Sequence, residues 1–325
     1  MSTKDQLLNL FENNRGTYFS GEEIAKKLSV SRTAIWKAVK SLRSDGYNID
    51  AVQNKGYSLS SQSDILSVQG IRKYLQPVCS ELKFEIVPIL RSTNLMAREK
   101  ASYGIDEGYV VIANNQTDGK GRRGQSFYSP SDTGIYMSLL LRPHYLTARQ
   151  AVKLTTMAAA AACEAIEAVS GENAQIKWVN DIYIDGKKVS GILTEAQVGL
   201  ENDLIEYAIL GIGINVTEPD GGFPDELKDV AGAVFHQAQC DGKNRIVAEF
   251  LNHFMMYYTL PETSNYTESY KRRSLVIGKD IEIVRHDNRK KATALDIDDE
   301  CHLLVRFENG KTERLSSGEI SVRLS

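Results

Sequence analysis

Three helix signals follow one another within the first 45 residues, and this close spacing leaves few folds open to the start of the chain. Residues 7–11 carry apolar side chains at helical spacing. Ser20 and Glu23 form the signature of a capping box, and Ser31 is placed to cap a third helix that ends at Gly46. The sequence therefore predicts three short helices joined by tight turns.

A hairpin signal follows the third helix. Two extended runs, residues 48–53 and 57–60, flank Asn54-Lys55-Gly56, which is typical of a tight turn. Three helices followed by a hairpin predict a winged helix-turn-helix. The polar stretch 58–64 has the composition of an interdomain connection, so we place the first domain boundary after residue 64.

The outer face of the predicted third helix is basic. Residues 1–60 hold nine Lys or Arg against six Asp or Glu, whereas the whole chain has a net charge of -3. DNA binding would therefore rest on this local surface. The alternatives are a solvated helix face in a protein-interaction module and, for Trp36, packing against the first helix. The residues that we expect to contact DNA are Ser31, Arg32, Thr33, Trp36, Lys37, Lys40 and Lys55.

Beyond residue 65 the pattern changes twice. Up to about residue 270, short apolar runs alternate with longer helical stretches, which predicts a mixed α+β domain. From residue 275 on, brief strands are separated by polar turns, which suits a small all-β barrel. Because 325 residues exceed the usual size of one hydrophobic core, we expect three domains, at residues 1–64, 65–272 and 273–325.

The four cysteines are far apart and form no Cys-x-x-Cys pair, which argues against a structural zinc site or a redox dithiol and fits free thiols in a reducing cytoplasm. The first eleven residues are those of an amphipathic helix and lack the apolar stretch of a secretion signal. No segment approaches the roughly 20 apolar residues that span a bilayer. We expect a soluble, cytoplasmic protein.

The segment 116–124, directly after the apolar run 109–113, carries the strongest chemical signal. Three glycines and three cations fill the six positions from Gly119 to Gly124. Glycine lets the backbone approach a ligand closely, while the cations and exposed amides attract carboxylate or phosphate. The spacing matches neither a P-loop nor a dinucleotide fingerprint. Taken alone, the loop is equally compatible with a nucleic-acid patch or a solvated turn.

Five motifs in the same order give the chain a resemblance to the bifunctional bacterial biotin-protein ligases, biotin operon repressors included, over essentially its whole length. They are Arg91-Ser92-Thr93-Asn94, Gln116 to Gly124, Lys177-Trp178-Val179-Asn180-Asp181, Lys188-Val189-Ser190-Gly191-Ile192-Leu193 and Gly211-Ile212-Gly213-Ile214-Asn215. The resemblance implies an α+β protein with an N-terminal winged helix-turn-helix, a central mixed-sheet α/β ligase domain and a C-terminal SH3-like β-barrel. It also implies that biotin and MgATP form biotinyl-5'-AMP and pyrophosphate, after which a lysine of a biotin carboxyl carrier domain, that of acetyl-CoA carboxylase, attacks the mixed anhydride.

The resemblance assigns roles to individual residues, with Lys188 and Arg122 as the catalytic pair. Biotin carboxylate and ATP repel each other, so fixed cations are needed to bring them within bonding distance. The residues assigned to biotin are Ser92, Thr93, Asn94, Gln116, Lys120, Gly121, Arg122 and Lys188. Those assigned to ATP or the adenylate are Arg122, Arg123, Phe127, Lys177, Asn180, Asp181 and Asn215, with Mg²⁺ accompanying the ATP and no separate metal site.

Two local alternatives stay open. Lys187 and Lys188 adjoin after the Asp185-Gly186 turn, so their side chains point to opposite faces of a sheet and only one can enter the site. The resemblance selects Lys188. Ser92 and Thr93 are also placed to cap the helix that follows them, a role compatible with binding a ligand.

The chain departs from the family pattern at four places. Val179 stands for the usual proline, Lys120 for the first loop arginine, and Phe127 for a tryptophan. Ala231-Gly232-Ala233-Val234 stands for Ala-Thr-Ser-Leu and leaves a hydroxyl role unfilled. Because none of these changes removes a charge, we expect altered affinities rather than lost activity.

For regulation, the resemblance implies that biotinyl-5'-AMP is also a corepressor that promotes homodimerisation on a two-fold operator. Two other functions remain to be weighed. A ligand sensor without turnover is disfavoured by the presence of Lys188, Arg122 and Lys177. A lipoate-type acyl ligase is disfavoured by the Gly-Lys-Gly-Arg-Arg-Gly loop.

Overall fold

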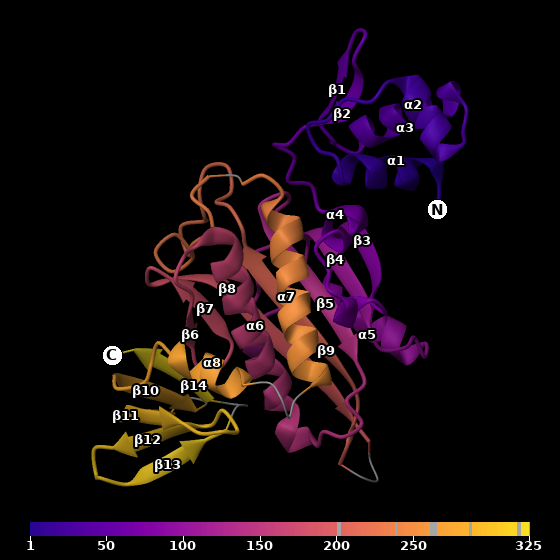
Figure 1. The fold of residues 1–325 in the computed structure, drawn as a ribbon. Helices are drawn as coiled ribbons and strands as arrows, with labels where there is room; N and C mark the ends of the chain where they lie inside the picture. The colour runs from indigo at the N-terminus through magenta and orange to yellow at the C-terminus, as the bar shows by residue number, and fades with distance from the viewer. Residues whose placement is uncertain (200–202, 238, 261–264, 286–287, 317–319, 325) are drawn as a thin grey trace. The chain divides into compact units, whose positions relative to one another are not determined.

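The chain forms two compact units in a computed structural model that describes residues 1–199, 203–237, 239–260, 265–285, 288–316 and 320–324 (Figure 1). The first unit comprises Met1–Leu75 and Gln237–Ala248, and the second comprises Gln76–His236 and Glu249–Ser325. The first unit thus holds more than the expected segment 1–64. Within the described residues, no helix is both long and apolar enough to cross a membrane.

The first unit contains the predicted winged helix. Its elements are α1 (Thr3–Glu12), α2 (Gly21–Leu28), α3 (Arg32–Ser44), β1 (Ile49–Val52), β2 (Gly56–Leu59) and α4 (Val68–Arg72). The capping box is present, since Glu23 N–H donates to Ser20 Oγ and Ser20 N–H donates to Glu23 Oε2. The apolar stripes of α1, α2 and α3 meet in one core that includes Phe11, Ile24 and Leu42.

The turn of the wing depends on Gly56. This residue has a φ of +99°, and a Cβ placed on it would lie 2.1 Å from the carbonyl oxygen of Phe19. Phe19 and Tyr57 exchange two backbone hydrogen bonds at this point, of 2.9 Å each. The wing is therefore bonded to the segment that precedes α2, and only glycine permits so close an approach.

A buried group of charges, the Asp241 cluster, lies inside the first unit. The carboxylates of Glu12 and Asp241 are each bonded to Arg15 and Lys73, at 2.5–3.0 Å. Tyr74 Oη–H donates to Asp241 Oδ2 at 2.7 Å. The side chains of the four charged residues are between 0% and 12% exposed, so each charge depends on its partners rather than on water.

The second unit is built on a seven-stranded mixed sheet with the strand order β3-β4-β5-β9-β8-β7-β6, in which only β3 and β4 are parallel. The strands of this sheet are β3 (Lys83–Leu90), β4 (Tyr109–Gln116), β5 (Gly134–Leu141), β6 (Gln175–Lys177), β7 (Asp181–Ile184), β8 (Lys187–Val198) and β9 (Ile205–Asn215). The predicted central α+β domain is confirmed.

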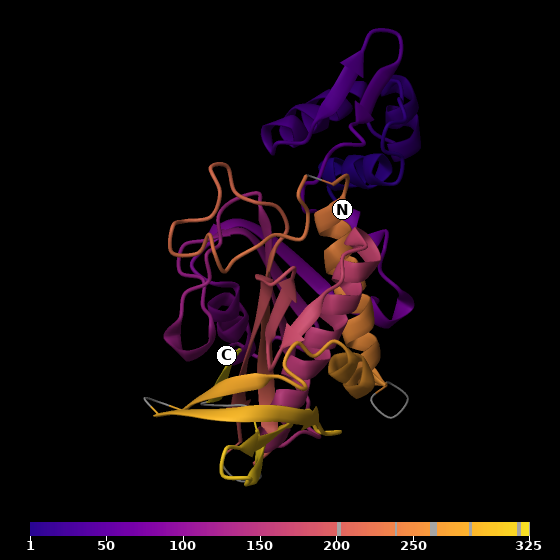
Figure 2. The same cartoon turned by 90° about the vertical axis from the view of Figure 1, so that its left-hand side faces the viewer.

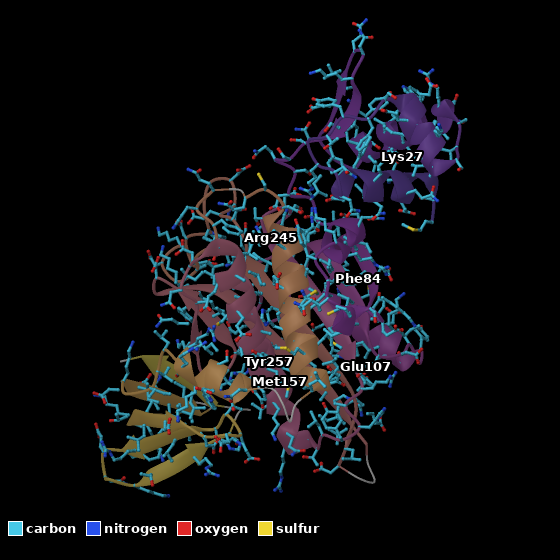
Figure 3. All side chains as sticks on the ribbon, in the orientation of Figure 1. Lys27, Phe84, Glu107, Met157, Arg245 and Tyr257 are labelled. Carbon is cyan, nitrogen blue, oxygen red and sulfur yellow. The ribbon has the colours of Figure 1, made fainter. Side chains whose placement is uncertain are left out.

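Helices cover both faces of this sheet. The remaining helical segments of the described chain are η1 (Pro77–Cys79), α5 (Thr93–Ser102), η2 (Arg122–Gly124), η3 (Ala148–Ala151), α6 (Val152–Ser170), α7 (Gly242–Thr259) and α8 (Tyr266–Arg272). α6 and α7 lie side by side on one face, and α5 packs on β4, β5 and β9 at the other (Figures 1 and 2). Met157 of α6 and Tyr257 of α7, both buried, are labelled in Figure 3 where the two helices meet.

The predicted small β domain is also confirmed, as a five-stranded antiparallel sheet in the order β13-β12-β11-β10-β14. Its strands are β10 (Asp280–Arg285), β11 (Asn288–Ile297), β12 (Leu303–Phe307), β13 (Thr312–Leu315) and β14 (Ile320–Leu324). Apolar residues of the first four strands, such as Ile281, Ala294 and Val305, are fully buried.

Candidate functional site

A polar pocket opens on the α5 face of the large sheet. It is lined by Ser92, Thr93, Asn94, Gln116, Lys120, Phe127, Gly191, Leu193, Gly211, Ile212 and Gly213. Segments from four of the five motifs thus meet there, although they are up to 121 residues apart in sequence, counted from Ser92 to Gly213. The structure brings together five of the eight residues expected to bind biotin, and it adds Phe127, which was expected on the nucleotide side.

The two glycines of the Gly-x-Gly-x-Asn motif leave room for side chains from other motifs. A Cβ on Gly211 would lie 2.0 Å from Asn94 Oδ1, and one on Gly213 would lie 2.4 Å from the ring of Phe127. Phe127 also contacts Tyr136 edge to face, with 6.3 Å between ring centroids. Glycine is required at both positions of β9 because the side chains of Asn94 and Phe127 already occupy the space that a Cβ would fill.

A hydrogen-bonded chain of neutral side chains forms the floor of the pocket. Gln116 Oε1 accepts from the backbone N–H and the hydroxyl of Thr93, at 2.8 and 3.1 Å, and Gln116 Nε2 donates to Ser129 Oγ at 3.1 Å. Ser138 Oγ lies 2.7 Å from Thr93 Oγ1 and 2.6 Å from Asn94 Oδ1. This arrangement presents neutral donors and acceptors in fixed orientations.

Sequence reasoning did not identify Ser129, Ser138 or Glu195, which support the pocket. Ser138 had a detectable signal, because it is a small hydroxyl side chain among the apolar residues of the fully buried strand β5. Glu195 accepts from Asn94 Nδ2 at 2.8 Å, so the amide of Asn94 is bonded to protein at both ends and shapes the pocket. Ser92 occupies the N-cap of α5 but makes no side-chain capping hydrogen bond, so its expected capping role is wrong.

The predicted catalytic cations converge on the turn between β6 and β7. Arg122 Nη1 donates to Asn180 Oδ1 at 2.8 Å, and Lys188 Nζ lies 2.7 Å from Asp181 Oδ1. Asn180 Nδ2 in turn donates to Asp181 Oδ1 at 2.9 Å. One short turn therefore holds both cations, and burial lowers the pKa of the Arg122 guanidinium somewhat while the Asp181 carboxylate opposes that shift.

The other two cations of the glycine-rich loop, Lys120 and Arg123, have partners outside this turn. Arg123, in the left-handed region with φ of +57°, donates to the backbone oxygen of Val284 in β10 at 3.4 Å. Lys120 pairs with Asp118 at 2.7 Å, and this hydrogen bond lowers the pKa of the Asp118 carboxyl. Arg123 is therefore not placed beside Arg122 at the turn.

Lys187 and Lys188 have different partners, as the alternation along a strand requires. Lys187 Nζ donates to the carbonyl oxygen of Lys228 at 3.1 Å, whereas Lys188 reaches Asp181. A Cβ on Gly191 would lie 3.3 Å from Lys188 Nζ, so the lysine lies over the strand that lines the pocket. The geometry supports the choice of Lys188 over Lys187.

The segment 230–234 acts through its backbone. Lys188 N–H donates to Val230 O, Gly232 N–H donates to Lys188 O, and Asn215 Nδ2 donates to Gly232 O, at 2.8–3.0 Å. A Cβ on Gly232 would lie 2.8 Å from Lys187 Cβ, which explains glycine where the family pattern has threonine. The hydroxyl of the family's threonine is absent here because this segment packs too closely on β8 to admit a side chain at position 232.

Lys177 lies on the same hairpin, with Nζ 5.6 Å from the ring centroid of Tyr183. Tyr183 is a further residue that sequence reasoning missed, because only the strand register places it opposite Gln175 and Lys188, and so on the face that Lys177 shares. No group of three or more His, Cys, Asp or Glu that could hold a metal is present among the described residues.

The face of α3 expected to contact DNA is exposed. Trp36 is 54% exposed, and Lys40 Nζ lies 5.5 Å from the centroid of its ring. Arg32 and Trp36 line a groove together with the wing residues Val52 and Asn54. The remaining residues of the set, Thr33, Lys37, Lys40 and Lys55, are exposed, and Ser31 caps α3 by accepting from Ala34 N–H at 3.1 Å.

Three family profiles match the chain. The Biotin/lipoate A/B protein ligase family matches residues 86–215, the HTH domain matches residues 3–58, and the Biotin protein ligase C terminal domain matches residues 276–323. Fold and site together define the class: a helix-turn-helix joined to a ligase domain of the biotin/lipoate type and its C-terminal domain.

Whole-length relatives narrow this class. The protein named bifunctional ligase/repressor BirA of Bacillus spizizenii is 34% identical over 326 residues, covering 98% of each chain, and its Bacillus subtilis namesake matches to the same extent. The chain belongs to this family of bifunctional biotin-protein ligases. The structure of biotin protein ligase from Aquifex aeolicus in complex with biotin and ATP has the same fold, with a TM-score of 0.61 and 24% identity, over 75% of this chain and 99% of that one.

Proposed function

We propose that this protein activates biotin with MgATP to biotinyl-5'-AMP and transfers the biotinyl group to a lysine of a biotin carboxyl carrier domain, that of acetyl-CoA carboxylase. The observation that carries the proposal is that Arg122 and Lys188 bond to the adjacent residues Asn180 and Asp181, while the loop and the strand that bear the two cations also line a pocket of neutral polar side chains. Two cations at this point offset the repulsion between a carboxylate and an α-phosphate and stabilise the charge that develops between them.

The polar pocket favours biotin over lipoate. The ureido ring of biotin offers two N–H donors and a carbonyl acceptor, whereas the dithiolane ring of lipoate offers neither. Thr93, Asn94 and Gln116 line the pocket and supply hydrogen-bonding groups for such a ring, and Ser129 and Ser138 hold these groups in fixed orientations. Ligand-specific thermal stabilisation distinguishes the two substrates: biotin should raise the unfolding temperature and lipoate should not.

For the nucleotide we propose Arg122, Arg123, Phe127, Lys177, Asn180, Asp181 and Asn215 as contacts. The side-chain oxygens of Asn180 and Asp181 are ligands of the kind that Mg²⁺ binds together with substrate phosphates, so we expect the ion to bind as MgATP. When bound, it neutralises phosphate charge. Asp181 holds the Lys188 ammonium at the turn, and Asn180 holds the Arg122 guanidinium, before substrates bind.

The test is biotin-dependent exchange of labelled pyrophosphate into ATP, followed by transfer of labelled biotin to an isolated biotin carboxyl carrier domain. Exchange without biotin, or with lipoate in its place, would contradict the assignment. Exchange that is absent under all conditions would favour a ligand sensor without turnover.

We further propose that the protein represses transcription as a homodimer, with biotinyl-5'-AMP as corepressor, in the cytoplasm. The support is the exposed basic face of α3 and the wing, with Ser31, Arg32, Thr33, Trp36, Lys37, Lys40 and Lys55 as the DNA-contacting set. A gel shift on operator fragments with and without biotin and ATP tests this role. Sedimentation under the same conditions tests whether the adenylate promotes dimerisation.

A further inference from the structure

Residues 178–181, the turn between β6 and β7 together with the first residue of β7, are held by two sets of bonds. On the site side, Asn180 bonds to Arg122 and Asp181 bonds to Lys188. Asn180 Nδ2 also donates to Ile192 O in β8 at 3.0 Å, which fixes the amide orientation. The positions of both catalytic cations therefore depend on where this turn lies.

The other side of the turn is anchored by two buried hydrogen bonds from distant parts of the chain. Trp178 Nε1–H donates to the carbonyl oxygen of Cys301, in the turn between β11 and β12, at 3.0 Å. Tyr270 Oη–H, from α8, donates to the carbonyl oxygen of Val179 at 3.0 Å. Trp178 is 4% exposed and Tyr270 is 0% exposed, so water does not replace a bond that is lost.

We propose that Tyr270 and Trp178 are positioning residues for adenylate formation: they set the 178–181 turn, and through it Arg122 and Lys188, without touching substrate. The proposal rests on the proposed function and names which parts of the chain enforce the geometry of its site. Removing the Tyr270 bond leaves the carbonyl oxygen of Val179, in the turn, without its donor, and removing the Trp178 bond releases the turn from the carbonyl oxygen of Cys301. In both cases the turn loses an anchor and shifts.

The effect should fall on ATP and on adenylate formation more than on the binding of biotin alone, because the polar pocket contains no residue of the 178–181 turn. The hydrogen bonds of the polar pocket come from Thr93, Gln116, Ser129 and Ser138, none of which is bonded to the turn. A purely structural role for Tyr270 and Trp178 would instead weaken both substrates together with the stability of the fold.

The experiment compares Tyr270→Phe and Trp178→Phe with Tyr266→Phe. Tyr266 lies in the same helix α8, is also buried at 6% exposed, and bonds to Thr156 of α6 rather than to the turn. Each variant is assayed by pyrophosphate exchange for kcat and for the KM of each substrate, and by calorimetric titration for the Kd of ATP and of biotin. Thermal unfolding is measured on the same samples.

We expect kcat/KM for ATP to fall about fivefold to tenfold in Tyr270→Phe and in Trp178→Phe, the size of one buried hydrogen bond. The Kd of biotin should stay within about twofold of wild type in both, and Tyr266→Phe should change neither substrate. Equal losses for ATP and biotin, equal losses in Tyr266→Phe, or unchanged ATP parameters would overturn the proposal. Absence of exchange in the wild type would count against the proposed function alone, because the ATP titrations still compare the variants.

Discussion

Lys188 Nζ and Asp181 Oδ1 lie 2.7 Å apart across the β7–β8 hairpin, so the lysine expected to join biotin and ATP is held by a carboxylate before either substrate binds. Both side chains are part-exposed, at 35% and 25%, so an arriving phosphate can compete with Asp181 for the ammonium. The ion pair thus orients the Lys188 ammonium, and little free energy is needed to break the pair when a phosphate binds.

Lys188→Ala should abolish adenylate synthesis, whereas Lys187→Ala should retain it within about threefold. The ammonium of Lys188 faces the turn that holds Arg122, but that of Lys187 is bonded to the backbone of Lys228 on the other side of the strand. Pyrophosphate exchange measures both variants. A normal exchange rate in Lys188→Ala would refute its catalytic role.

Gly211→Ala should weaken biotin binding by at least tenfold, because its Cβ would lie 2.0 Å from Asn94 Oδ1 and force the wall of the pocket to move. Gly21→Ala is the control: its Cβ would meet only Tyr57, at an ordinary 3.8 Å. Calorimetric titration with biotin compares the two. Equal biotin affinity in both variants would show that the pocket lies elsewhere.

Asp241→Asn should destabilise the first unit by about 2 kcal/mol, because it leaves the buried Arg15 and Lys73 with Glu12 as their shared carboxylate. Asp225→Asn, at an exposed pair with Lys228, should change stability by less than about 0.5 kcal/mol. Amide hydrogen exchange in α1 and α4 reports on this unit separately. Similar amide exchange rates in the two variants would contradict the claim that the Asp241 cluster stabilises the first unit.

Asp64→Asn should stabilise the protein at neutral pH. Burial raises the pKa of Asp64 to about 6, despite the hydrogen bond that its Oδ1 accepts from Lys243 N–H. The unfolded chain, with a pKa of about 3.9, releases the proton first, so the contribution of Asp64 to stability is complete below about pH 4 and is lost as pH rises through about 6.

The asparagine keeps the acceptor and carries no charge. We therefore expect a gain on the order of 1–2 kcal/mol in the urea unfolding free energy at pH 7.5, shrinking towards zero near pH 4. A gain of the same size at both pH values would mean that the charge of Asp64 is not its cause.

Lys37→Gln should weaken DNA binding similarly for all sequences and reduce the slope of log affinity against log salt by about 1, as loss of one phosphate contact does. Lys37 is exposed on α3 beside Trp36, whereas the equally exposed Lys279, next to β10, offers the control Lys279→Gln. Fluorescence anisotropy across a salt series measures both. An unchanged slope for Lys37→Gln would remove α3 from the DNA interface.

The local features of this protein followed from the sequence. The capping box of Ser20 and Glu23, the hairpin turn at Gly56 and the glycine-rich loop depend on residues a few positions apart, and their backbone preferences act in any context. The family resemblance that the five ordered motifs carry selected Lys188 and Arg122, whereas the local pattern alone left Lys187 and Lys188 as alternatives.

Only the tertiary structure decided which of these segments meet and what holds them. Tyr270 and Val179 are 91 residues apart, and Arg15 and Asp241 are 226 apart, yet each pair is bonded. No local preference specifies such contacts, since a buried donor finds its acceptor only when two packed surfaces bring them together. Arg123 makes the same point, because nothing in its local sequence specifies the hydrogen bond that its guanidinium donates to the backbone of β10.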